Sequence, residues 1–402
     1  MSAVPAASTT TTTTSTAPVT LSRWAGWVDR CLAWRDRTLA SPRFQRRAAA
    51  FALTRPVARR HARELFDLVA GFVYSQVLLA CVQLRLFDIL AERPQSLDQL
   101  AARLALPVDA AQRLLAAAVS LRLVERRSEG RYGLGELGAP MVGNRAVAAM
   151  VEHHASLYAD LADPVALLRG GSGNASAGAL ARYWPYADAA SPGGLSNDGV
   201  ATYSALMSAS QPLVADEILD AYSWRGHRCL LDVGGGEGSF LCSAAARLPG
   251  LQLLLFDLPA VADRARERFA AQGLSARARA VGGSFLTDTL PRGADVASLV
   301  RVIHDHDDAA AMTVLRAVRQ ALPPGGTLLL AEPMSGTPGA EAMGDAYFGF
   351  YLLAMGRGRP RTSAELTQML QAAGFEAVRL LPTRMPLQTQ LLVARCAGVN
   401  PV

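Results

Sequence analysis

The chain contains no lysine, and all forty basic residues among its 402 are arginine, which indicates compositional bias rather than a function. Its cysteines are few, odd in number and scattered, and no two of them form a Cys-x-x-Cys pair. Their pattern excludes a zinc site built on paired cysteines and a disulfide framework, and it favours a reducing compartment. The cysteines are Cys31, Cys81, Cys229, Cys242 and Cys396.

Secretory and membrane-spanning signals are also missing. The first twenty residues hold neither a charged start nor an apolar stretch, so we expect no signal peptide. The longest apolar region, residues 65–84, is interrupted by Asp67, Ser75, Gln76 and Gln83, and we predict a buried helix there rather than a membrane span. We therefore expect a cytoplasmic protein.

Positive charge is concentrated near the N-terminus. Residues 21–63 hold eleven Arg and two Asp, a net charge of +9, whereas residues 1–20 are uncharged. Because the whole chain carries +6, the remainder carries −3. The sequence thus describes a near-neutral body with a basic N-terminal arm, which we define as residues 21–60.

Tryptophan accompanies arginine in the arm, behind a Thr/Ser/Ala/Pro tract (1–20) that we expect to be disordered. Trp24, Trp27 and Trp34 lie three and seven residues apart, which places them on one helical face. One interpretation is peripheral contact with the inner membrane, with tryptophan at the headgroups of anionic lipid. Packing of the arm on the body or on a dimer partner is the alternative. Nucleic acid is not expected, because no known binding module surrounds these residues.

Residues 61–145 predict a helical domain with a two-stranded wing. That pattern alone would suggest a winged-helix DNA-binding module. The second helix, however, carries Gln112 and Arg113 among alanines and leucines, which is too apolar for a face that reads a DNA groove. The predicted elements are an apolar helix over 62–90, a capped helix starting at Ser96, a helix over 107–119, and strands at 123–125 and 131–134.

Residues 146–225 are predicted to form a helical connector with loose Gly/Ser stretches. It contains the pair His153-His154, which could suggest a metal site. Adjacent side chains on a helix diverge, and no acidic or cysteine partner stands at ligand spacing. We therefore expect no metal here or elsewhere in the chain.

The stretch from Cys229 to Phe240 predicts a nucleotide-like ligand site. A short apolar strand leads into a glycine turn, and a helix follows at once. Gly234 and Gly236 permit positive φ and let a ligand lie on the backbone, beside the free N–H groups of the helix start. Asp257, which ends the next strand, is placed to accept both hydroxyls of a ribose. Gly283, Ser284 and Phe285 follow the third strand, where the aromatic ring could close over an adenine.

Residues 226–396 alternate between strand and helix, which predicts an α/β doubly wound sheet with its ligand at the carboxyl ends of the strands. The last two strands are linked through Pro382 and Pro386 and are expected to form an antiparallel edge. Strands are predicted near 229–233, 251–256, 278–281, 296–302, 327–331, 377–381 and 388–394.

Four motifs resemble those of the S-adenosylmethionine-dependent O-methyltransferases that include the acetylserotonin and plant phenolic enzymes. They are Leu231-Asp-Val-Gly-Gly-Gly-Glu-Gly238, Phe256-Asp-Leu-Pro259, Gly282-Gly-Ser-Phe285 and Arg301-Val-Ile-His-Asp305. The resemblance covers roughly residues 62–396. It implies a Rossmann-like methyltransferase domain (226–396) that binds S-adenosylmethionine, a winged-helix dimerisation domain (61–145), a substrate cap (146–225) and a homodimer.

The resemblance also implies a catalytic base. His304 follows the fourth strand, so its ring faces the ligand crevice. An aliphatic hydroxyl has a pKa of roughly 16, like water, so the base must take the proton during methyl transfer. The family pattern makes His304 that base and Glu332 its orienting partner, and it makes Arg301 a contact of the cofactor. The alternatives are a purely structural histidine and an Arg301 that only pairs with a carboxylate.

The acceptor is predicted to be apolar. The segment 334–360 is rich in Met and aromatic residues, which form an adaptable apolar wall. By resemblance, Tyr203 and Met207 line the acceptor chamber, with ordinary helix core as the alternative. We place Met343 and Tyr347 in the apolar wall, with a helix packed on the dimer partner as the alternative. Within the family, this segment and the arm are most similar to the bacterial hydroxyneurosporene (demethylspheroidene) methyltransferases. The implied acceptor is the tertiary hydroxyl of an acyclic hydroxycarotenoid.

Two departures from the plant members leave alternatives open. Ser284 stands where they have Asp, and Pro360 stands where they have a second Glu beside the histidine. A phenol or polyketide acceptor is the first alternative. A catalytically dead winged-helix regulator is the second, although its glycine turn and His304 would then be expected to be lost.

Overall fold

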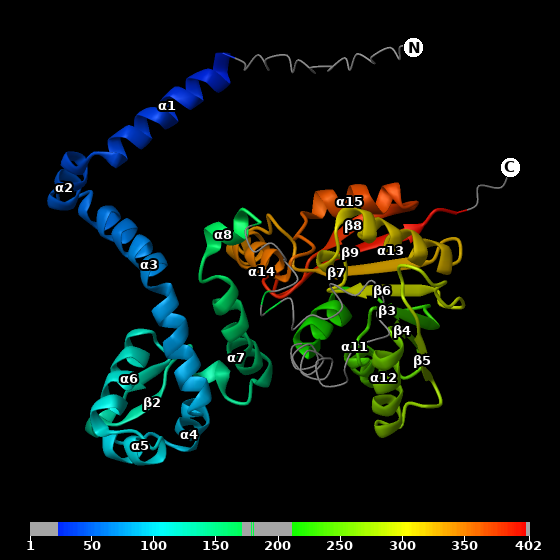
Figure 1. The fold of residues 1–402 in the computed structure, drawn as a ribbon, viewed down its shortest axis with the longest axis horizontal. Helices are drawn as coiled ribbons and strands as arrows, with labels where there is room; N and C mark the ends of the chain where they lie inside the picture. The colour runs from blue at the N-terminus through cyan, green and yellow to red at the C-terminus, as the bar shows by residue number, and fades with distance from the viewer. Residues whose placement is uncertain (1–22, 171–177, 179, 181–210, 399–402) are drawn as a thin grey trace, which may run out of the picture. The chain divides into compact units, whose positions relative to one another are not determined.

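The computed structural model describes residues 23–170, 178, 180 and 211–398 (Figure 1). The predicted disordered tract 1–20 and the predicted chamber residues Tyr203 and Met207 lie outside these ranges. The chain divides into two compact units, residues 1–75 and 76–402.

The first unit is made of helices that expose both tryptophan and arginine. Helix α1 spans Arg23–Ala40 and α2 spans Pro42–Ala50. Ser41 separates them, because its hydroxyl accepts from the Phe44 N–H and Pro42 takes the first helical position. Trp24, Trp27 and Trp34 are 74%, 56% and 65% exposed. The prediction that they share a helix is confirmed.

Helix α3 spans Arg55–Gln83, and the prediction that residues 65–84 are buried is wrong for its first half. Leu65, Leu68 and Phe72 are 64%, 82% and 66% exposed, and burial begins only near Cys81. By its length and composition, α3 could cross a membrane. Only 17% of its most apolar 18-residue stretch is buried. An apolar face of this kind is expected to be covered by another protein surface or by lipid.

The segment after α3 folds as three helices and a hairpin around a small core. Ser96 caps α5 in a reciprocal capping box with Gln99, as the sequence predicted. Tyr132 of the hairpin is buried and pairs through its backbone with Gln95. The helix–helix–wing arrangement is thus present. Its elements are α4 (Leu86–Glu92), α5 (Leu97–Arg103), α6 (Val108–Ser120), β1 (Val124–Arg126), η1 (Ser128–Gly130), β2 (Tyr132–Leu134) and η2 (Ala139–Met141).

The connector contains α7 (Arg145–Asp160) and α8 (Pro164–Leu168), and residues 211–221 are helical. The two histidines on α7 each bond to a tyrosine hydroxyl: His153 to Tyr351 and His154 to Tyr347, both at 2.8 Å. In the described part of the chain, no group of three His, Cys, Asp or Glu side chains is placed to hold a metal ion.

The rest of the second unit is a seven-stranded sheet with helices on both faces (Figure 1). Five strands are parallel, and β8 and β9 add the antiparallel edge that the sequence predicted, in the order β5-β4-β3-β6-β7-β9-β8. The strands are β3 (Cys229–Val233), β4 (Gln252–Asp257), β5 (Ala278–Gly282), β6 (Val296–Val300), β7 (Thr327–Glu332), β8 (Phe375–Leu381) and β9 (Gln390–Cys396).

Two hydrophobic cores cover the faces of the sheet, because successive strand residues point to opposite sides. In β3, Leu231 and Val233 join the core under α13 and α15, whereas Leu230 joins the core under α11 and α12. The doubly wound α/β prediction is therefore confirmed. The helices are α11 (Ser239–Arg247), α12 (Pro259–Ala271), α13 (Asp308–Ala321) and α15 (Ser363–Ala372), and the crevice side also carries η5 (Ile303–Asp305), η6 (Ala342–Tyr347) and α14 (Phe348–Met355).

At the opposite end of the sheet, Asp295 ties β6 to β3. Its carboxylate accepts from the backbone N–H of Cys229 at 2.7 Å, from that of Arg228 at 3.0 Å and from His227 Nδ1 at 2.9 Å. Removing the carboxylate would leave those backbone donors unpaired at the edge of the core.

We therefore predict that Asp295→Ala lowers the free energy of unfolding by about 1–3 kcal/mol, measured by urea denaturation. Asp263→Ala is the matched control, because Asp263 belongs to a largely exposed ion pair with Arg266 and should change stability by about 0–1 kcal/mol. Equal losses in the two variants would contradict the assigned role of Asp295.

Candidate active site

The glycine turn leaves room for a ligand at the carboxyl end of β3. Gly234, Gly236 and Gly238 adopt φ of +69°, +58° and +79°, values that side chains other than glycine rarely tolerate. A Cβ at Gly236 would meet nothing within 4 Å, whereas one at Gly238 would lie 2.6 Å from Phe269. Gly238 therefore serves packing, and Gly236 faces open space as the sequence predicted.

A buried carboxylate lies beneath this turn. Asp232 is 1% exposed, and its Oδ1 accepts from the Ser298 hydroxyl at 2.6 Å. Its Oδ2 has no hydrogen-bond partner among the described residues and lies 2.4 Å from the position of a Cβ at Gly235. Burial raises the pKa of Asp232 to about 7. The hydrogen bond from Ser298 lowers this pKa, and the charge of the nearby Asp257 raises it. An unpartnered acceptor under the glycine turn is suited to a cationic ligand group.

Asp257 ends β4 beside the glycine turn, as predicted. Its Oδ2 accepts from the Gly236 N–H at 2.8 Å and its Oδ1 from the Leu258 N–H at 2.7 Å. Burial raises the pKa of Asp257 to about 6, although both backbone bonds lower it. Each carboxylate oxygen keeps a second lone pair, so the group can still accept from hydroxyls.

Residues 283–285 lie at the end of β5 and approach the same crevice. A Cβ at Gly283 would lie 2.6 Å from the Phe256 ring, so glycine is required here for packing. The Ser284 N–H donates to Asp288 at 2.8 Å. The Phe285 ring stands edge-on to the His306 ring, with 5.4 Å between the ring centroids. Its Cε1 atom lies 3.5 Å from the position that a Cβ on Gly234 would take. Phe285 thus borders the crevice.

Arg301 occupies the strand end next to the glycine turn. Its φ is +56°, an unusual conformation for a residue other than glycine, and its N–H donates to Ala331 O at 2.8 Å. Its guanidinium donates to the Gln211 side chain. This strained backbone lies three residues before His304, where the chain turns out of β6.

His304 and Glu332 meet in the interior, as the sequence predicted. His304 is 7% and Glu332 is 2% exposed, and the His304 Nδ1 forms a close hydrogen bond with Glu332 Oε2. The other oxygen, Oε1, accepts from the N–H groups of Val302 at 3.0 Å and Ile303 at 2.7 Å. Glu332 therefore fixes the backbone before His304 and holds the proton on Nδ1.

A second carboxylate occupies the other side of the ring. The Oδ1 of Asp305 lies 3.0 Å from His304 Nε2, a charge contact without the alignment of a good hydrogen bond. Burial alone lowers the pKa of His304, but the charges of Asp305 and Glu332 raise it to about 10. The two carboxylates therefore favour the protonated ring, and Asp305 lies beside the ring nitrogen that Glu332 leaves free.

Aromatic side chains connect His304 to the predicted apolar wall. The Phe348 ring lies 5.8 Å from His304, and Tyr347 stands edge-on to Phe348 at 5.1 Å. Tyr347 also bonds to His154, while Met343 is half-buried in the same π-helix, η6. The structure therefore connects Tyr347 with the site, and Phe348 is a neighbour of His304 that the sequence reasoning did not select.

Comparison with known proteins decides the family. The O-methyltransferase domain model matches residues 158–376, and the O-methyltransferase dimerisation domain model matches residues 66–144. The chain belongs to the O-methyltransferase family. The resemblance to S-adenosylmethionine-dependent members is thereby confirmed, and the wing-bearing segment matches the dimerisation domain of this family.

Individual relatives agree. The chain is 43% identical over 359 residues to demethylspheroidene O-methyltransferase of Cereibacter sphaeroides, covering 89% of this chain and 93% of that protein. It is 33% identical over 351 residues to acetylserotonin O-methyltransferase of Mus musculus, covering 85% of this chain and 90% of that protein. The solved structure of CalO1, a methyltransferase in calicheamicin biosynthesis in its SAH-bound form, is 27% identical with a TM-score of 0.70, covering 84% of this chain and 98% of that one.

The dimerisation domain includes part of the exposed face of α3. The matched domain begins at residue 66, within the exposed apolar stretch that includes Leu68 and Phe72. Homodimerisation is therefore the expected state of this O-methyltransferase.

Two residues of the site were missed by sequence reasoning. Asp305 was visible only as part of a motif, and nothing in the sequence indicated that its carboxylate turns back towards the His304 ring. Asp232 was read as part of a strand, although an acidic residue inside an otherwise apolar strand was a signal of a buried functional carboxylate. Both depend on side-chain directions that spacing does not specify.

The pH dependence of activity should follow the titration of His304. The family pattern implies that His304 is the base, and a base must be neutral to act, so we predict that kcat/KM for the acceptor rises with pH towards about 10, the pKa of His304 in the acceptor-free protein. Asp305→Asn removes one of the raising charges, so the rising limb should move to lower pH. Imidazole titration by NMR in both proteins is the direct check, and an unchanged pKa in Asp305→Asn would contradict this account.

Proposed function

We propose that this enzyme transfers the methyl group of S-adenosylmethionine to the tertiary hydroxyl of an acyclic hydroxycarotenoid of the hydroxyneurosporene or demethylspheroidene type, with His304 as the general base. The observation that carries the proposal is the buried His304–Glu332 pair at the carboxyl ends of β6 and β7. The likeness to demethylspheroidene O-methyltransferase over most of the chain supports the acceptor class.

The residues at the crevice suit the donor. The sulfonium of S-adenosylmethionine supplies an activated methyl group when it is bound. Gly236 offers an open backbone position beside Gly234, Asp232 offers an unpartnered carboxylate oxygen beneath the turn, and Asp257 offers acceptors for ribose hydroxyls. Phe285 and Ser284 would border the adenine side and Arg301 the strand end.

His304 would take the acceptor proton at Nε2. Glu332 holds Nδ1–H, so the neutral ring presents a lone pair at Nε2, towards the position that Asp305 now occupies. Displacement of Asp305 by the acceptor hydroxyl would free that lone pair and lower the pKa of the ring. The rest of the site would hold the methyl carbon and the acceptor oxygen about 3–3.5 Å apart and exclude water.

The wall beside His304 favours an apolar acceptor. Phe348, Tyr347 and Tyr351 pack against one another next to the base, and the hydroxyls of both tyrosines are bonded to histidines of α7. Their polar atoms are thus satisfied within the protein, and the surface left for an acceptor is aromatic. Met343 and the predicted residues Tyr203 and Met207 would extend this wall.

The decisive experiment is a methyl-transfer assay with labelled S-adenosylmethionine and a panel of hydroxycarotenoids and phenols. We predict transfer to acyclic tertiary hydroxycarotenoids and a fall of about 10²–10⁴-fold in kcat for His304→Ala, the usual contribution of a general base. His227→Ala is the matched control, because His227 is also bonded to a carboxylate, but at the other end of the sheet. Transfer to phenols alone would overturn the acceptor class, and undiminished transfer by His304→Ala would overturn the base.

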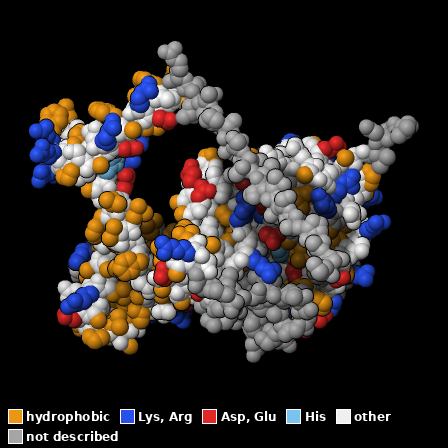
Figure 2. All heavy atoms as spheres, turned by 45° about the horizontal axis from the view of Figure 1, so that its top comes forward, with side chains coloured by type: hydrophobic (Ala, Val, Ile, Leu, Met, Phe, Trp, Pro, Cys, Tyr) orange, Lys and Arg blue, Asp and Glu red, His pale blue; other side chains and the backbone are white. Residues whose placement is uncertain are grey.

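For the arm we propose peripheral attachment to the anionic cytoplasmic face of the inner membrane, where a carotenoid resides. Exposed tryptophans and arginines lie together on α1, and Figure 2 shows arginine beside hydrophobic side chains over the arm. In α1, Arg30 and Arg37 flank the face of Trp27 and Trp34 by helical spacing. Tryptophan at the headgroups and arginine near anionic lipid, each charge contributing about 1 kcal/mol, fit this surface.

Vesicle sedimentation tests this attachment. The full chain should bind vesicles containing phosphatidylglycerol but not purely zwitterionic ones, and Arg30→Gln with Arg37→Gln should weaken that binding by about 2 kcal/mol. Arg316→Gln with Arg379→Gln is the charge-matched control in the second unit and should bind like the wild type. Equal binding by all three proteins, or none to anionic vesicles, would contradict the proposal.

A further inference from the structure

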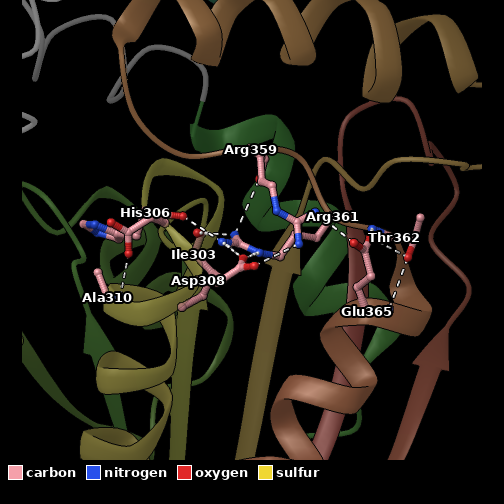
Figure 3. A network of polar contacts seen from close by, with 9 residues as sticks. Ile303, His306, Asp308, Ala310, Arg359, Arg361, Thr362 and Glu365 are labelled. Atoms are coloured by element: carbon pink, nitrogen blue, oxygen red, sulfur yellow. Dashed lines mark hydrogen bonds and ion pairs between the residues drawn. The ribbon is translucent and has the colours of Figure 1, made fainter. Parts of the chain in front are cut away.

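A buried arginine holds the turn that carries the base. Arg361 is 2% exposed, a rare state for an arginine unless its donors are paired. It stands just before α15, far from His304 in sequence, and its guanidinium reaches under the turn that joins β6 to α13 (Figure 3). Its role was not anticipated from the sequence.

The guanidinium bonds to both sides of the catalytic turn. Its Nη1 donates to Ile303 O at 2.8 Å and its Nη2 to His306 O at 2.7 Å, so the carbonyls before and after His304-Asp305 share one cation. Its Nε and Nη2 donate to Asp308 Oδ1 at 2.9 and 2.7 Å. The planar fork thus links the start of the turn, its end and the first turn of α13 (Figure 3).

The backbone around Arg361 is fixed from two other directions. The Ser335 N–H donates to Arg361 O at 3.0 Å, which connects it to the segment after Glu332. The Thr362 hydroxyl caps α15 by accepting from the Glu365 N–H at 3.1 Å. The backbone of Arg361 is therefore held by the helix cap and by the continuation of β7.

The segment that leads into Arg361 also closes on the turn. The Arg359 N–H donates to His304 O at 2.9 Å. A Cβ on Gly358, at φ +76°, would lie 2.1 Å from the same oxygen. Residues 358–361 therefore form a brace that contacts the backbone of residues 303, 304 and 306.

We propose that Arg361 is a positioning residue that sets the direction of the His304 ring. Glu332 orients the side chain of His304 through its bond to Nδ1. Arg361 orients the backbone on which that side chain stands. Glu332 bonds the N–H groups of Val302 and Ile303, Arg361 bonds the carbonyls of Ile303 and His306, and between them the turn has little freedom.

Lysine cannot replace this fork. An ammonium group can make three bonds from one point, whereas the acceptors here, Ile303 O, His306 O and Asp308 Oδ1, surround a plane. A displacement of the reacting group by about 1 Å can reduce a rate about 10²-fold. The proposal rests on His304 being the base, and it predicts a change in kcat rather than in the binding of S-adenosylmethionine, which other residues would hold.

The test compares Arg361→Lys and Arg361→Ala with the wild type in the full chain. We expect kcat to fall about 10²-fold in each, with KM for S-adenosylmethionine unchanged. Guanidinium chloride at concentrations below those that unfold the protein should restore part of the kcat of Arg361→Ala, because the ion can occupy the vacated cavity. Circular dichroism and calorimetric binding of S-adenosylmethionine establish how much of each variant is folded.

Arg359→Ala is the matched control. The Arg359 side chain shares the Asp308 carboxylate at 3.2 Å and pairs with Glu365, but only its backbone touches the turn, so kcat should be that of the wild type. Because Arg359 belongs to the brace and shares Asp308, a second control is Arg277→Ala, whose guanidinium donates to the backbone carbonyls of Leu248, Leu251 and Ala245 away from the turn. Undiminished kcat in Arg361→Lys, equal losses in Arg277→Ala, or loss only in proportion to unfolded protein without guanidinium rescue would overturn the proposal. Failure of the proposed base would instead show as an active His304→Ala variant.

Discussion

The site depends on one constraint: a buried imidazole is held between two carboxylates at the end of a parallel sheet. Glu332 fixes Nδ1 and the preceding backbone, and Asp305 stands at Nε2. Glu332 could not be buried so deeply without a partner, because an unpaired charge in the interior is costly. The same pairing that makes this site stable makes its histidine a poor base until an acceptor displaces one carboxylate.

Stability and activity therefore depend on pH in opposite directions. Burial lowers the pKa of His304, but the two carboxylates raise it from 6.5 to about 10, so the protonated ring is favoured in the folded state. Its contribution to stability is fully present below pH 6.5 and is lost as pH rises through about 10. Catalysis needs the neutral ring. Binding of the acceptor, rather than bulk pH, is the event that can satisfy both requirements.

Much of the fold follows from the sequence because it is encoded in short-range patterns. The strand β3, the glycine turn and the capped helices are each specified by neighbouring residues, and the pairing of His304 with Glu332 follows from two adjacent strands that end at one edge. The exposed half of α3 was mispredicted because an apolar helical pattern does not tell whether the core of its own chain or another surface covers it. Arg361 and Asp305 were missed because their roles depend on where a side chain turns after the backbone is placed.

The central claim concerns the direction of one ring nitrogen. A crystal structure of the enzyme with S-adenosylhomocysteine and a hydroxycarotenoid acceptor tests it most directly. The account predicts the acceptor oxygen within about 2.6–3.2 Å of His304 Nε2, with Asp305 turned away and Nδ1 still on Glu332. An acceptor oxygen bound elsewhere, with Asp305 still at Nε2, would contradict it.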